Sequence, residues 1–104
     1  MFFAVRLVRG GPWDWSKDLR EQAGFAEHAE FMDRLVDEGF IVLGGPLGGE
    51  REILHAISAD SAQEVRERLG EDSWAANGML QIKSIEPWTV LLDGRRLDRS
   101  PARG

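Results

Sequence analysis

The chain has 104 residues, of which 42% are hydrophobic and 30% charged, and these values indicate one folded domain rather than a disordered segment. It contains no cysteine, which excludes disulfides, thiolate nucleophiles and cysteine-based zinc sites and fits a reducing compartment. The net charge is −5, and the last twelve residues, with four arginines and two aspartates, leave −7 on residues 1–92. A domain this acidic repels phosphate backbones, so we expect no nucleic-acid partner.

The two ends of the chain carry no sign of a membrane segment. Arg6 interrupts the N-terminal apolar run too early for the core of a signal peptide, and no later run approaches the roughly 20 residues of a membrane span. We therefore expect a cytoplasmic protein with no membrane partner. Residues 1–92 are expected to form the domain, and residues 93–104 an arginine-bearing tail that is either a solvated end or docked, for instance on a partner subunit.

The first half of the chain is predicted to form a strand, a loop, a helix and a second strand. Residues 2–8 are aromatic and aliphatic and predict a strand, and residues 10–21, rich in glycine and mixed in charge, predict a loop. Apolar residues recur at spacings of three and four over residues 22–38, which predicts an amphipathic helix that a glycine ends. Residues 40–43 predict a short buried strand, which the glycine-rich turn at 44–49 ends.

The second half predicts a strand, a helix and a strand. Residues 52–58 predict a strand, and a Ser-x-x-Glu capping box starts a helix over residues 61–69. Residues 71–78 predict a loop, and residues 79–85 a last strand that Pro87 ends.

The order β-α-β-β-α-β predicts a ferredoxin-like α+β fold, in which a four-stranded antiparallel sheet carries two helices on one face. The first strand is apolar on both sides, since Phe3, Val5 and Leu7 alternate with Ala4 and Val8. No other segment is available to cover the second face of the sheet. We therefore expect a homodimer that forms through the sheet faces.

His28 is the first candidate for chemistry, because it falls among apolar residues on the helix face expected to contact the sheet. A buried imidazole needs partners for its ring nitrogens, so His28 is either a core residue bonded to a backbone carbonyl or a general acid–base at a pocket. The second hypothesis needs an orienting carboxylate. Asp72 is the candidate, because its loop can approach the first helix in this topology, although Asp72 can also serve as a turn or capping residue.

Three tryptophans and a Gly-Pro turn are candidates for lining a ligand site. Trp13, Trp15 and Trp74 fall in predicted loops, where they act either as lids and interface anchors or as walls for a flat apolar ligand. The segment around Gly45 and Pro46 lacks the Lys-Ser/Thr of a Walker loop and precedes a strand, so we reject phosphate binding. It is either a tight turn or backbone that lines a ligand site.

Two further groupings are weaker. Arg20, just before the predicted helix, could hold an anion, but we favour a role at the helix start. His28, His55 and Asp72 could in principle bind a metal, yet the chain has only two histidines, and they are far apart in the sequence. We therefore expect no metal site.

Residues 28–47, a helix with a leading histidine followed by a glycine stop, a strand and a Gly-Gly-Pro-Leu turn, resemble the signature of the YCII-related (YciI-like) family. Asp72 and the Ile-Glu-Pro-Trp at 85–88 match further landmarks, so that the resemblance spans residues 2–92. It implies a ferredoxin-like fold of the dimeric α/β-barrel superfamily. It also implies an active site in which His28 and Asp72 take the positions of the family's His and Asp.

The resemblance does not imply one reaction, although a few relatives act on chlorinated or hydroxylated aromatic rings. Our first hypothesis is a cofactor-independent isomerase, lyase or dehydrohalogenase, in which His28, oriented by Asp72, moves a proton on a small, anionic, cyclic or aromatic metabolite. The alternative is a non-catalytic ligand-binding or assembly module with a structural histidine. Haem or flavin binding, by analogy with other dimeric α/β-barrel proteins, is a third option, and we expect no cofactor.

Overall fold

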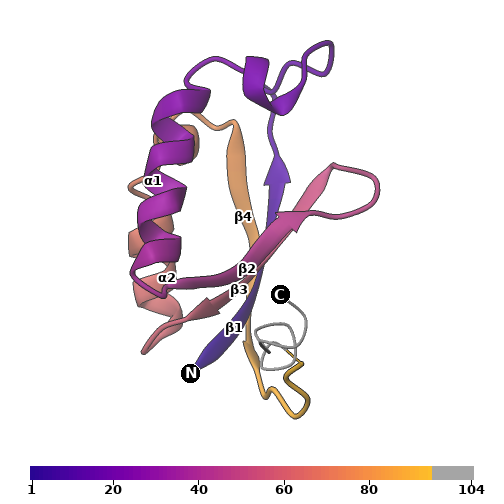
Figure 1. Cartoon of the computed structure of the whole chain (residues 1–104). Helices are drawn as coiled ribbons and strands as arrows, with labels where there is room; N and C mark the ends of the chain where they lie inside the picture. Colours follow the sequence, from indigo (N-terminus) through magenta and orange to yellow (C-terminus); the bar gives the residue numbers. More distant parts are fainter. Residues whose placement is uncertain (95–104) are drawn as a thin grey trace, which may run out of the picture.

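The computed structural model describes residues 1–94, and the last ten residues of the predicted tail lie outside them. Its elements are β1 (Phe2–Arg9), the 3₁₀ turn η1 (Leu19–Glu21), α1 (Phe25–Asp37), β2 (Ile41–Pro46), β3 (Glu52–Ser58), α2 (Ala62–Leu69), α3 (Ser73–Ala76) and β4 (Leu80–Trp88). The strands form one antiparallel sheet in the order β2-β3-β1-β4, and α1 and α2 lie on the same face of it (Figure 1). This confirms the predicted α+β class and antiparallel sheet, and it is compatible with a ferredoxin-like arrangement.

The period-two alternation of β1 fixes which side chains face the helices. Phe3, Val5 and Leu7 are buried, whereas the residues between them are partly exposed. The helices and the segment after α2 complete this core with Leu35, Val65, Leu69 and Trp74. Arg9 continues the same alternation, so β1 ends by placing an arginine on the helix side of the sheet.

The opposite face of the sheet is covered by no helix among residues 1–94 (Figure 1). It carries Ala4 beside a row of ion pairs that crosses the strands, in which Glu52 lies 3.5 Å from Arg6 and 2.6 Å from Lys83. The face is therefore part apolar and part charged, and the expected sheet-to-sheet dimer stays a prediction.

Two boundaries in the first half differ from the prediction. The helix begins at Phe25 rather than at residue 22, because Gly24 at the N-cap has a φ of 77°, a left-handed conformation that glycine adopts without strain. The strand expected to stop before Gly44 continues to Pro46, so the prediction of a turn from residue 44 is wrong. Hydrogen bonding to β3 extends through these residues, and Gly44 pairs with His55.

Two predictions in the second half are also wrong. Pro87 does not end the last strand, because β4 is an edge strand, where a missing N–H on the open side breaks no ladder hydrogen bond. The predicted loop at 71–78 contains the single helical turn α3, which Asp72 caps. No helix in the described residues is long and apolar enough to cross a bilayer.

Candidate functional site

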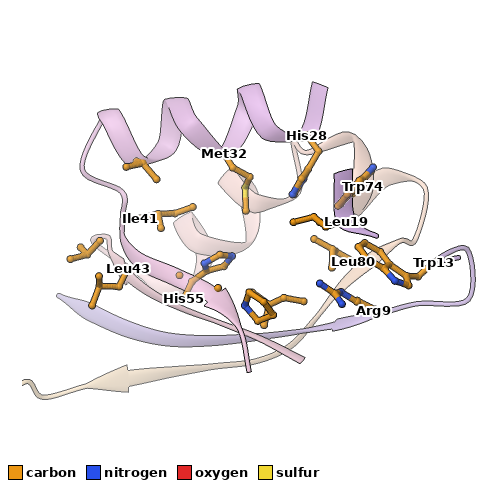
Figure 2. Close-up of a pocket in the computed structure, with 16 residues that line it drawn as sticks. Arg9, Trp13, Leu19, His28, Met32, Ile41, Leu43, His55, Trp74 and Leu80 are labelled. Carbon is orange, nitrogen blue, oxygen red and sulfur yellow. The ribbon is translucent and has the colours of Figure 1, made fainter. Parts of the chain in front are cut away.

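A cavity of about 410 Å³ lies between α1, the β2 and β3 strands and the segments that follow β1 and α2 (Figure 2). Its wall is mostly apolar and includes Trp13, Leu19, Met32, Ile41, Trp74 and Leu80. Within the described part of the chain, three of the lining side chains have titratable groups, namely Arg9, His28 and His55. An apolar cavity with a few polar groups is the usual form of a small-molecule site.

His28 and Asp72 form a buried pair at the α1 side of this cavity. Nδ1 of His28 lies 2.7 Å from Oδ2 of Asp72. The other carboxylate oxygen, Oδ1, accepts a hydrogen bond from the backbone N–H of Trp74 at 3.2 Å, which caps α3. Asp72 is thus a capping residue and the partner of His28 at the same time, one oxygen for each role.

The ring of Trp74 packs against one face of the His28 imidazole. The Trp74 ring stacks on His28 with centroids 3.9 Å apart and planes 10° apart. Trp74 is itself fixed, because its indole N–H donates to the carbonyl of Ala23 at 2.9 Å and the Trp13 ring meets it edge-on at 5.4 Å. The plane and the edge of the His28 ring are therefore both determined by neighbouring side chains.

This arrangement leaves one ring nitrogen of His28 for a ligand. A carboxylate at Nδ1 favours the tautomer that carries its proton there, so that Nε2 keeps a lone pair. Nε2 has no hydrogen-bond partner among residues 1–94, and the ring reaches from α1 toward the cavity (Figure 2). A molecule in the cavity can therefore give a proton to Nε2, while Asp72 stabilises the imidazolium that results.

His55 faces the same cavity from the sheet. It is 6% exposed, and neither of its ring nitrogens has a hydrogen-bond partner in the described residues. Burial, and to a smaller extent the charge of His28, lower the pKa of His55 to about 4, so the ring is neutral at pH 7. Gly44 makes room for it, because a Cβ at Gly44 would overlap Nδ1 of His55.

Arg9 enters the cavity from the end of β1. Its side chain is only 5% exposed, and its guanidinium carbon lies 4.1 Å from the centre of the Trp13 ring. Among residues 1–94, Nε is buried without a hydrogen-bond partner, and a carboxylate oxygen of the exposed Glu50 lies 3.9 Å from Nη1. Burial lowers the pKa of Arg9, which Glu50 partly opposes, and the guanidinium stays protonated at neutral pH.

The structure brings most of the predicted site residues together. Trp13, Trp74, Gly45 and Pro46 line the cavity, with Asp72 behind His28 rather than in the wall. Trp15 is not among the lining residues. It is 54% exposed and packs on the outer side of Trp13, with ring centroids 6.3 Å apart.

Arg9 was not a predicted site residue, and His55 was considered only as a metal ligand. The signal for both is the alternation of their strands, because Arg9 continues the inward series of β1, and His55 lies between the buried Ile53 and Ile57. Within residues 1–94, no group of three or more His, Asp or Glu side chains is placed to hold a metal ion.

Neither a comparison of the chain with known protein families nor one with curated proteins finds a match.

Proposed function

We propose that the chain is a YCII-related, cofactor-independent acid–base enzyme of the isomerase, lyase or dehydrohalogenase type, which acts on a small cyclic or aromatic metabolite. One observation carries the proposal. His28 is held by Asp72 at 2.7 Å through one ring nitrogen, while its other nitrogen is unpartnered among residues 1–94 at the edge of an apolar cavity.

In this mechanism Nε2 of His28 takes a proton from the substrate, and Asp72 stabilises the charge that forms on the ring. An isomerase returns the proton to a different atom of the same molecule. A dehydrohalogenase releases it to water after the electron pair of the broken C–H bond has formed a double bond and the halide has left. The rings of Trp13 and Trp74 support the proposal, because a flat substrate fits an aromatic wall.

The proposal includes a cytoplasmic homodimer that packs the helix-free sheet faces together, as in a dimeric α/β barrel. Its support is a sheet face with no helix over it, in which Ala4, Leu54 and Ala56 lie on neighbouring strands. Ala4→Arg should shift the protein to monomers in sedimentation velocity, whereas Glu30→Gln, on the exposed side of α1, should not. A wild-type monomer at high protein concentration would contradict the dimer.

A non-catalytic binding module is the alternative, and the stacking of Trp74 on His28 favours it, because a ring held on its face and at Nδ1 also serves structure. This alternative expects His28→Gln to keep both the fold and the ligand affinity.

The test is proton exchange in D2O with a panel of small halogenated, hydroxylated and lactone rings, followed by NMR. We expect deuterium incorporation or product with at least one class of compound, and a loss of about 10²–10⁴-fold in rate for His28→Gln. Glu30→Gln, on the solvent side of the same helix, is the matched control and should keep the wild-type rate. An equal rate in His28→Gln would exclude the acid–base role.

A further inference from the structure

Arg9 is a buried cation that has only a long ion pair, with the exposed Glu50, and a contact with the Trp13 ring among residues 1–94. Its side chain is 95% buried, and within residues 1–94 its Nε has no hydrogen-bond partner and no other group of the guanidinium is hydrogen-bonded. Buried charges in proteins are normally paired and hydrogen-bonded, because an unpaired charge loses its hydration without compensation. A cation left in this state on the wall of a cavity points to a ligand that supplies the missing acceptor.

The neighbours of Arg9 among residues 1–94 do not supply a hydrogen-bond acceptor for its guanidinium. Glu50 lies 3.9 Å away, too far for a hydrogen bond, and its side chain is 68% exposed. The guanidinium carbon lies 4.1 Å from the centre of the Trp13 ring, a cation–π contact that stabilises the charge but offers the N–H groups no carbonyl or carboxylate acceptor. Arg9 therefore keeps several donors for a molecule in the cavity.

The composition of the cavity wall restricts the charge of that molecule. Among residues 1–94, Arg9 is the only arginine or lysine in the wall, and the other lining residues of this part of the chain are apolar apart from two histidines. One guanidinium matches the two oxygens of one carboxylate, whereas a phosphate dianion is usually met by several cationic or backbone donors. The wall thus fits an organic monoanion with an apolar body.

We propose that Arg9 is the anchor for the carboxylate of a small, largely apolar organic acid, the ring of which extends from Arg9 toward His28. Arg9 comes from β1 on the sheet side of the cavity and His28 from α1 on the opposite side (Figure 2). A molecule bound at Arg9 would therefore extend across the cavity toward His28, which moves the proton in the proposed mechanism. The inference rests on the proposed function for the role of His28, and it adds the substrate class.

The experiment measures binding of benzoate and of its uncharged analogue benzamide, followed by the NMR signals of the Trp13 and Trp74 indole N–H groups. We expect saturable binding of benzoate, with benzamide at least about 10-fold weaker. Arg9→Gln should lower the affinity for benzoate by about 10- to 100-fold and leave the affinity for benzamide unchanged. The matched control is Arg51→Gln, since Arg51 lies 5.3 Å from the Trp15 ring and outside the cavity wall.

Several results would overturn the anchor. These are equal affinities for benzoate and benzamide, an equal loss of both in Arg9→Gln, or no saturable binding of benzoate. Inorganic phosphate is added as a competitor, and displacement of benzoate by an equal concentration of phosphate would overturn the carboxylate assignment. The anchor and the proposed function are separated by their readouts, because Arg9→Gln tests the affinity for benzoate without any turnover, whereas His28→Gln tests the rate of proton exchange in D2O.

The stability of the Arg9 variants removes the remaining ambiguity. If the acceptors for Arg9 come from a ligand, Arg9→Met should unfold at an unchanged or higher temperature without ligand, because it removes a buried charge whose ion pair with Glu50 is long and exposed. If Arg9 is a structural residue, the same variant should unfold at a lower temperature. Arg9→Lys keeps the charge but loses the planar fork, and it should bind benzoate more weakly than the wild type.

Discussion

The polar groups on the two sides of the cavity differ in whether the protein supplies them with hydrogen-bond partners. On the α1 side, Nδ1 of His28 has a carboxylate at 2.7 Å, and a tryptophan stacks on the ring. On the sheet side, His55 and Arg9 are equally buried, yet both ring nitrogens of His55 and Nε of Arg9 have no partner in the described residues. In the enzyme that we propose, the group that moves the proton is held by the protein, whereas the groups that would recognise a ligand keep their hydrogen-bonding capacity for it.

The largest effect on the partnered side is expected from Asp72→Ala. This change removes the cap of α3 and leaves Nδ1 of His28 buried without an acceptor, so we expect a loss of about 2–4 kcal/mol in the free energy of unfolding. Denaturant titration measures it. Asp72→Asn is the matched variant, because its amide oxygen can still cap Trp74 N–H.

The same pair of variants tests the tautomer of His28. In the wild type we expect the nitrogen NMR shifts of the ring to report a proton on Nδ1, and in Asp72→Asn we expect that preference to be lost. If Asp72→Ala is as stable as the wild type, or if the tautomer of His28 is the same in Asp72→Asn, Asp72 does not hold the His28 ring in solution.

On the sheet side we expect a pH dependence of stability from His55. Its pKa is about 4 in the folded protein and about 6.5 when unfolded, so the unfolded chain binds a proton first as the pH falls. The contribution of the neutral ring is complete above pH 6.5 and is lost as the pH falls toward 4. It declines by about 1.4 kcal/mol per pH unit, roughly 3 kcal/mol in total.

The measurement is the free energy of unfolding between pH 4 and 7 in the wild type and in His55→Leu. His28, paired with Asp72, and Arg9 also face this cavity, and the difference between the two proteins isolates the part that belongs to His55. Parallel pH profiles would mean that the ring of His55 is solvated or partnered in solution.

A smaller effect is expected from Gly44→Ala, which tests the space around His55. The new Cβ would overlap Nδ1 of His55, so the ring must move or the β2 and β3 strands must separate. Overpacking of this kind costs about 1–3 kcal/mol. Gly45→Ala on the same strand is the control, because nothing lies within 4 Å of its Cβ position, and equal stabilities of the two variants would contradict the close contact.

Much of the fold followed from local patterns in the sequence. The period of two in β1 and the period of three to four in α1 gave the elements, and the topology brought the Asp72 segment to His28. The failures concern long-range pairing. Pro87 lies within a strand because β4 is at the edge of the sheet, and residue-by-residue propensity does not report which strand is at the edge.

The unpartnered side of the cavity was missed for a different physical reason. Alternation predicts that Arg9 and His55 face the helices, but it does not say whether a side chain on that face finds a partner. A missing partner is a property of the whole packing around a residue. It becomes visible only when the surroundings of Nε of Arg9 and of the His55 ring are known.

The smallest effect is expected from Trp15→Ala, which separates the wall of the cavity from its outer surface. Trp15 is 54% exposed and lies outside the lining, so we expect a change within about 0.5 kcal/mol in stability and little change in benzoate affinity. Trp13→Ala is the contrasting variant, since Trp13 is buried between Arg9 and Trp74. Calorimetric titration of both variants with benzoate compares them. A loss of benzoate binding in Trp15→Ala as large as that in Trp13→Ala would place Trp15 against the bound ligand, which is one of the two roles that the sequence leaves open.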